Sequence, residues 1–140
     1  MKVFLDTNIW LRFFIDDRTA LHATSRELIN SIEAGTHEPY TSAIVCLEVQ
    51  YVLKTFYKQP IQKVHKYIEA VLSTRNMTLI DKTDFKRAWD LHRKTGNKLS
   101  DCLILTQIPS TVALCTFDEH LVKQTQVKTV KPEELVKEES

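Results

Sequence analysis

The chain has 140 residues, which is enough for one domain with a substantial hydrophobic core. Its 19 Lys and Arg residues nearly balance its 18 Asp and Glu residues, and this excludes a general electrostatic attraction to nucleic acid. The first residues do not resemble a signal peptide and no apolar run is long enough to cross a bilayer, so we expect a cytoplasmic protein. Three widely spaced cysteines, Cys46, Cys102 and Cys115, lie in apolar runs and are expected to be buried free thiols.

An apolar run at the start of the chain leads directly into an acid. Val3, Phe4 and Leu5 are typical of a buried strand in a parallel sheet, and Asp6 follows at once. Helical periodicity and short apolar runs then alternate along the chain. The predicted strands are residues 3–5, 39–42, 77–80, 111–115 and 127–130, and the predicted helices are a short one ending at residue 14, then 20–33, 42–57, 61–73, 83–95 and a short one from residue 99.

This alternation predicts an α/β fold. We expect a single-domain parallel β-sheet of about five strands with helices on both faces, an α/β/α sandwich. The domain is predicted to span residues 1–130. Residues 131–140 are predicted to be a charged tail that frays or forms one loose turn.

Four acids occupy positions where the fold would bring them together. Asp6 and Asp118 each follow an apolar strand, and the carboxyl ends of parallel strands share one edge of the sheet. Glu48 and Asp101 interrupt the apolar sequences of two helices. Four carboxylates in one cleft would raise each other's pKa unless a cation neutralised them, and oxygen ligands without histidine favour Mg²⁺ or Mn²⁺.

Each acid also has a purely structural interpretation. Asp6 and Asp101 could be helix caps, and Asp118 could be an ordinary turn residue. Glu48 has the weakest such alternative, because an unpaired Glu on an apolar helix is costly to bury. Glu119 could be a fifth ligand, although we favour a surface position. Trp10 and Trp89 stand at apolar helical positions and are expected in the core.

The order and spacing of four short motifs resemble those of the PIN-domain family, small metal-dependent ribonucleases that include the VapC toxins of prokaryotic toxin–antitoxin pairs. The motifs are Leu5-Asp6-Thr7-Asn8, the run from Thr41 to Val49 that contains Glu48, Leu99-Ser100-Asp101, and Thr116-Phe117-Asp118. The resemblance implies that Asp6, Glu48, Asp101 and Asp118 are catalytic and hold one or two Mg²⁺ or Mn²⁺ ions. It also implies that Asn8, Thr116 and Ser42 support the site by hydrogen bonding.

The same resemblance implies a reaction and partners. The reaction would be metal-assisted hydrolysis of RNA phosphodiester bonds. Independently of the resemblance, Arg12, Lys54, Lys58 and Lys98 are candidates to hold the substrate near the cleft, and they are equally consistent with ordinary solvated charges. The partners would be a second copy in a homodimer and an antitoxin protein that places an Arg among the acids. Apolar candidates for such contacts are the Phe13-Phe14 helix and the helix from Tyr51 to Tyr57.

Two other functions have to be weighed against the nuclease. A haloacid-dehalogenase-type phosphatase also begins with an acid at the end of a strand, but it needs a second Asp two residues later, where this chain has Asn8. A non-catalytic PIN-like module that binds RNA or protein need not keep the acids, whereas this chain has all four.

Overall fold

The computed structural model describes residues 1–118, 120–121 and 126–137. Five parallel strands form one sheet in the order β3-β2-β1-β4-β5. Their bounds are β1 (Lys2–Leu5), β2 (Glu38–Ser42), β3 (Thr78–Ile80), β4 (Ala113–Cys115) and β5 (Thr129–Val130). The predicted parallel α/β sheet is therefore confirmed.

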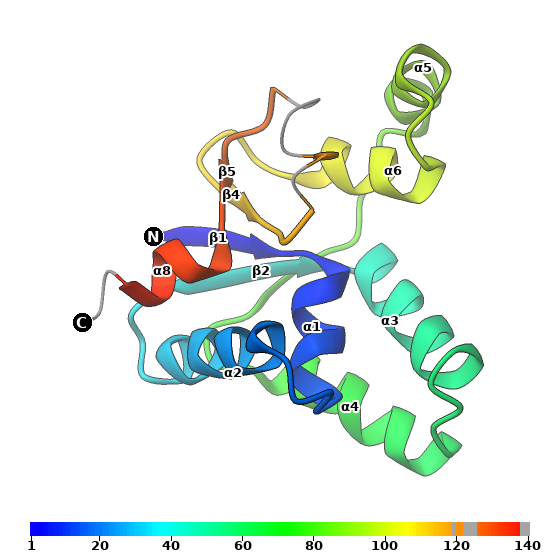
Figure 1. Ribbon diagram of the computed structural model, residues 1–140. Helices are drawn as coiled ribbons and strands as arrows, with labels where there is room; N and C mark the ends of the chain where they lie inside the picture. Colours follow the sequence, from blue (N-terminus) through cyan, green and yellow to red (C-terminus); the bar gives the residue numbers. More distant parts are fainter. Residues whose placement is uncertain (119, 122–125, 138–140) are drawn as a thin grey trace.

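Helices cover both faces of this sheet (Figure 1). In the view of Figure 1, α1 and α2 lie below the sheet and α6 lies above it, with α5 further out, and α8 packs against α2. The helices are α1 (Thr7–Phe14), α2 (Ala20–Glu33), α3 (Ala43–Thr55), α4 (Ile61–Ser73), α5 (Phe85–Thr95), α6 (Leu99–Gln107) and α8 (Pro132–Lys137). Within the described residues, no helix is long and apolar enough to span a membrane.

The strand β1 lies at the centre of the sheet and of the hydrophobic core. Its residues Val3, Phe4 and Leu5 are fully buried, as their uninterrupted apolar sequence predicts for a strand covered on both faces. The neighbouring strand β4 is also fully covered. Because Leu5 pairs with Cys115 in the parallel register, the residues that follow β1 and β4 leave the sheet side by side.

Local signals in the sequence set the ends of several helices. The side chain of Ser42 accepts a hydrogen bond of 3.2 Å from the backbone N–H of Val45 and so caps α3. Gly96 ends α5 with a φ of +72°, a left-handed conformation that costs glycine little.

The C-terminal residues 132–137 do not fray. They form α8, which packs against α2, and the side chain of Leu135 is fully buried in the core. The expected loose tail is therefore wrong for these residues. The reason is that Leu135 and Val136 give a short charged segment enough apolar surface to dock.

The burial of the two tryptophans and the three cysteines agrees with the sequence prediction only in part. Trp10 is fully buried as expected, but Trp89 is 45% exposed and stacks on Phe85, so the core position predicted for Trp89 is wrong. The physical reason is that α5 packs against α6 through the face that carries Ala88. All three cysteines are free thiols; Cys102 and Cys115 are buried, while Cys46 is only half-buried.

Candidate metal centre

Two strand ends place an acid and a hydroxyl in direct contact. Asp6 follows β1 and Thr116 follows β4, and the Thr116 hydroxyl donates a hydrogen bond of 2.7 Å to Oδ2 of Asp6. The same Thr116 oxygen accepts a hydrogen bond of 3.0 Å from the backbone N–H of Asp118. Thr116 therefore links the two strand-end acids through its hydroxyl group.

The carboxylate of Asp6 is almost completely covered, with 6% of the residue exposed. It caps α1, because its Oδ1 accepts a hydrogen bond of 2.8 Å from the backbone N–H of Thr7. Burial raises the pKa of Asp6, and the charge of Asp118 adds to the rise, while the hydrogen bonds from Thr116 and Thr7 oppose it. The capping interpretation and the site interpretation of Asp6 are therefore compatible.

Glu48 reaches this edge from the second turn of α3. The Thr7 hydroxyl lies 3.5 Å from its Oε1, and the Lys98 ammonium lies 3.7 Å from its Oε2. Burial raises the pKa of Glu48 to about 7, and the charges of Asp101 and Asp6 contribute, against the opposing effect of Lys98. A carboxyl with this pKa is only partly ionised at neutral pH unless a cation binds beside it.

Asp101 lies in the first turn of α6, but it does not cap that helix. The capping position belongs to Lys98, and α6 has no side-chain cap. Burial raises the pKa of Asp101, the charges of Asp6 and Asp118 add to the rise, and Lys98 opposes it. Because the helix begins at Leu99, before Asp101, the capping interpretation of this residue is wrong.

Asp118 also has a local structural role. Its Oδ1 accepts hydrogen bonds of 3.0 and 3.1 Å from the backbone N–H groups of His120 and Leu121. It is thus a turn residue, and at the same time its charge affects both Asp6 and Asp101. Glu119, the possible fifth ligand, lies outside the described residues.

The structure separates the three residues expected to support the acids. Thr116 contacts Asp6, whereas the side chain of Ser42 is used to cap α3. Asn8 is exposed, and no hydrogen bond from its side chain to an acid is found within the described part of the chain. Sequence analysis missed Thr7, whose hydroxyl faces Glu48; its position directly after Asp6, at the first residue of α1, was the available signal.

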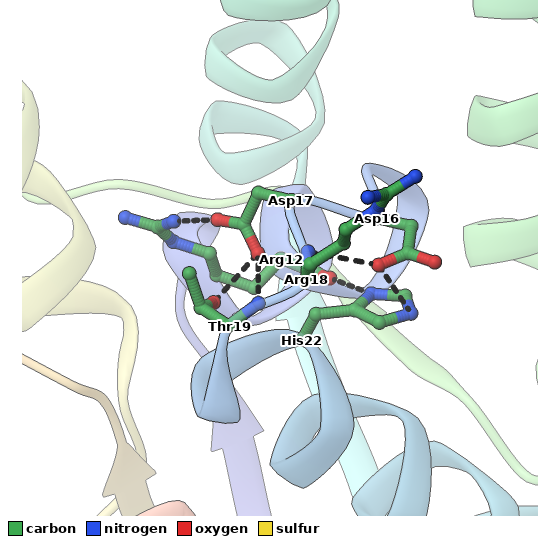
Figure 2. Close-up of polar contacts among 6 residues, drawn as sticks. All are labelled: Arg12, Asp16, Asp17, Arg18, Thr19 and His22. Atoms are coloured by element: carbon green, nitrogen blue, oxygen red, sulfur yellow. Dashed lines mark hydrogen bonds and ion pairs between the residues drawn. The ribbon is translucent and has the colours of Figure 1, made fainter.

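The cations expected near the site have different surroundings. Arg12 lies in the last turn of α1, at the opposite end from Asp6, and forms an ion pair with Asp17 (Figure 2). Figure 2 also shows Thr19 donating to Asp17, and these hydrogen bonds together with Arg12 lower the pKa of Asp17. Lys54 is six residues beyond Glu48, about 9 Å further along α3 and on another face. Among these candidates, Lys98 forms an ion pair with Glu48 in the described part of the chain.

The donor set suits a hard divalent cation. Four carboxylates come from four separate places in the chain. The charges of Asp6, Asp101 and Asp118 each raise the pKa of at least one other acid, and burial is the main reason for the raised pKa of Glu48. Oxygen-only ligands of this kind are typical of Mg²⁺ and Mn²⁺ sites. Within residues 1–118, 120–121 and 126–137, however, no three His, Cys, Asp or Glu side chains are arranged to hold a metal ion as they stand.

A family comparison places this arrangement among known proteins. The model of the PIN domain matches residues 3–126, nearly the whole chain. The chain belongs to the PIN-domain family. PIN domains are generally nucleases, so the family supports an enzyme of the hydrolase kind.

Solved structures confirm the PIN fold at low sequence identity. PAE2754 from Pyrobaculum aerophilum is 12% identical, with a TM-score of 0.68 over 99% of this chain and 88% of that chain. A chain of VapBC2 from Rickettsia felis, in a crystal structure with a DNA fragment from the VapBC2 promoter, is 16% identical. Its TM-score is 0.69, and the match covers 94% of this chain and 98% of that chain. No curated protein matches the chain.

Proposed function

We propose that this PIN domain is a metal-dependent endoribonuclease that uses Mg²⁺ or Mn²⁺ to hydrolyse RNA phosphodiester bonds. The observation that supports it is the electrostatic coupling of Asp6, Glu48, Asp101 and Asp118 at the carboxyl edge of the sheet. We assign these four residues as the catalytic acids and the metal ligands. Repulsion among them is a cost that the folded protein would recover on binding a cation.

In this proposal the four acids would hold the metal ion, and two threonine residues hold Asp6 in position. A divalent ion bound there supplies a Lewis acid for the scissile phosphate and lowers the pKa of a water molecule. Asp6 is held in place by Thr116 and Thr7, which fix both of its carboxylate oxygens. Glu48 and Asp101 approach from α3 and α6.

The first test measures metal binding without substrate. Millimolar Mn²⁺ should raise the melting temperature of the wild-type protein, because a ligand that binds only the folded state stabilises it. The double variant Asp6→Asn, Asp101→Asn should lose this shift. A shift of the same size in both proteins would show that the ion binds elsewhere.

The second test measures cleavage of single-stranded RNA. Asp6→Asn keeps the shape of the side chain but removes the charge, so cleavage in Mn²⁺ should fall by about a thousand-fold, which is about 4 kcal/mol in the barrier. Asp90→Asn, an exposed change on α5, is the matched control and should cleave normally. Near-normal cleavage by a folded Asp6→Asn protein would refute the proposal, and RNA binding without cleavage in any metal would favour a non-catalytic module.

The proposed protein partners follow from the family and from the VapBC2 neighbour. We assign the protein as the toxin of a toxin–antitoxin pair, with an antitoxin and a second copy of the chain as partners. Phe13 and Phe14 are packed against the core, with Phe14 stacked on Tyr67 at 4.6 Å, so this pair does not offer a free apolar surface.

The second copy would cover the exposed aromatic pair on α5. Phe85 and Trp89 are 55% and 45% exposed, and their stacked rings have centroids 6.4 Å apart. Sedimentation should show a wild-type dimer that Trp89→Ser weakens. A strict monomer at all concentrations, together with harmless overexpression in a bacterial host, would remove the toxin assignment and leave the nuclease assignment standing.

A further inference from the structure

A groove between α3 and α6 opens beside the acidic edge of the sheet. Its volume is about 460 Å³, within the range of about 300–1,000 Å³ that is usual for small-molecule sites. Leu47 and Tyr51 from α3 and Leu103 from α6 line its apolar part. A larger cavity, of about 720 Å³, lies elsewhere, between α5, α6 and residues 126–128, and none of the four acids lines it.

The polar end of the groove contains three groups of different chemistry. Glu48, Lys98 and Ser100 line this end, so the groove is continuous with the proposed catalytic acids. Lys98 pairs with Glu48 while 71% of its side chain stays exposed, which leaves its ammonium free to contact a further anion. The Ser100 hydroxyl oxygen is buried and has no hydrogen-bond partner within the described residues.

The apolar end of the groove is open to solvent. Tyr51 is 67% exposed and Leu47 is 61% exposed. Tyr51 follows Glu48 by three residues on the same helix, so the two side chains lie on adjacent turns of one face of α3. An aromatic ring, an unpaired hydroxyl and a cation therefore occur along one groove that ends at the acids.

We propose that this groove binds the nucleoside next to the phosphate that is cleaved, an inference that rests on the proposed ribonuclease function. Lys98 contacts the phosphate of that nucleotide, Ser100 forms a hydrogen bond to its sugar or base edge, and the base stacks on Tyr51. Exposed aromatic rings beside cations are the usual platform for single-stranded RNA bases. The Ser100 hydroxyl can both donate and accept, which matches a ribose hydroxyl.

Charge favours a nucleotide over an apolar helix as the occupant. A purely apolar partner would remove water from the Lys98 ammonium with only Glu48 as its partner, and it would leave the Ser100 hydroxyl without a hydrogen bond, which is costly. A nucleotide brings one negative charge to Lys98, hydroxyls to Ser100 and a flat apolar face to Tyr51. Of these occupants, only the nucleotide satisfies both ends of the groove.

The test uses the four nucleoside 5′-monophosphates as probes, in chelator, so that the result does not depend on bound metal. Their dissociation constants would be measured by NMR titration of the full chain. Tyr51→Ala and Lys98→Met should each weaken binding of the preferred nucleotide about tenfold, which is about 1.4 kcal/mol. Tyr51→Phe should retain binding because it keeps the stacking ring.

Phe56→Ala is the matched control for loss of an aromatic side chain. Phe56 is 74% exposed at the end of α3 and does not line the groove, so its removal should leave nucleotide binding unchanged. Melting curves would verify that each variant folds. None of these measurements requires RNA cleavage, so the assignment of the groove and the nuclease assignment can fail separately.

Three results would overturn the assignment of the groove. They are wild-type protein that binds none of the four nucleotides, Tyr51→Ala protein that binds as tightly as wild type, and Tyr51→Ala protein that loses a dimer seen by sedimentation. The third result would identify a second copy of the chain as the occupant. Metal-dependent RNA cleavage that is lost in Asp6→Asn would stand in all three cases.

Discussion

Replacing Glu48 by glutamine measures how strongly burial and the neighbouring carboxylates disfavour its charge in the metal-free protein. Burial and the charge of Asp101 raise the pKa of Glu48 from 4.5 to about 7 in the folded state. Between these pH values the folded protein binds more protons at this site than the unfolded chain does. The stability contributed by protonated Glu48 is therefore fully present below pH 4.5 and is lost as the pH rises through about 7.

The magnitude follows from the separation of the two pKa values. At about 1.36 kcal/mol per pKa unit, the shift from 4.5 to about 7 sets an upper limit of about 3 kcal/mol. Glu48 keeps some contact with solvent and with Lys98, so screening reduces this to about 1–2 kcal/mol. Glutamine has the same shape and cannot ionise. Glu48→Gln should therefore melt about 3–7 °C above wild type at pH 8.

The assay is thermal unfolding followed by far-UV circular dichroism in chelator at pH 8 and pH 4.5. The difference between Glu48→Gln and wild type should be largest at pH 8 and close to zero at pH 4.5. Glu69→Gln, an exposed change on α4, is the control and should show no difference at either pH. Equal melting temperatures for Glu48→Gln and wild type at pH 8 would refute the raised pKa of Glu48.

Substitutions at three further positions test a hydrogen bond, a helix cap and a buried side chain. Thr116→Val should lower the free energy of unfolding by about 1–3 kcal/mol, because buried Asp6 loses a donor, whereas Thr116→Ser should recover most of it; urea titration measures both. Ser42→Ala should cost about 0.5–2 kcal/mol by removing the cap of α3, and an unchanged urea midpoint would contradict this role. Leu135→Ala should lower the free energy of unfolding by about 2–5 kcal/mol because it empties a buried position of α8, whereas exposed Leu72→Ala should change it little.

The sequence alone determined the layout of this protein. Uninterrupted apolar runs such as Val3 to Leu5 identify buried strands, and helical spacing between them identifies the crossovers of a parallel sheet. Once the sheet is parallel, Asp6 and Asp118 must emerge at the same edge, because the carboxyl ends of its strands point the same way. These signals are local, and the observed fold agrees with them.

The tertiary structure decided which side chains meet. The hydrogen bond between Thr116 and Asp6 joins residues 110 positions apart, and no periodicity in the chain encodes it. Four basic residues were equal candidates near the acids, yet Lys98 contacts Glu48 while Arg12 pairs with Asp17. Such pairings depend on the distances between elements after packing, which sequence spacing does not supply.

Burial at the edges of the fold was also decided by packing. Periodicity shows which face of a helix is apolar, but it does not show whether another element covers that face. Trp89 stays exposed because α5 packs against α6 through Ala88, and Leu135 is buried because α2 offers a surface to a short C-terminal helix. For Leu135 the helix that covers the side chain lies near the other end of the sequence, so no local pattern could predict its burial.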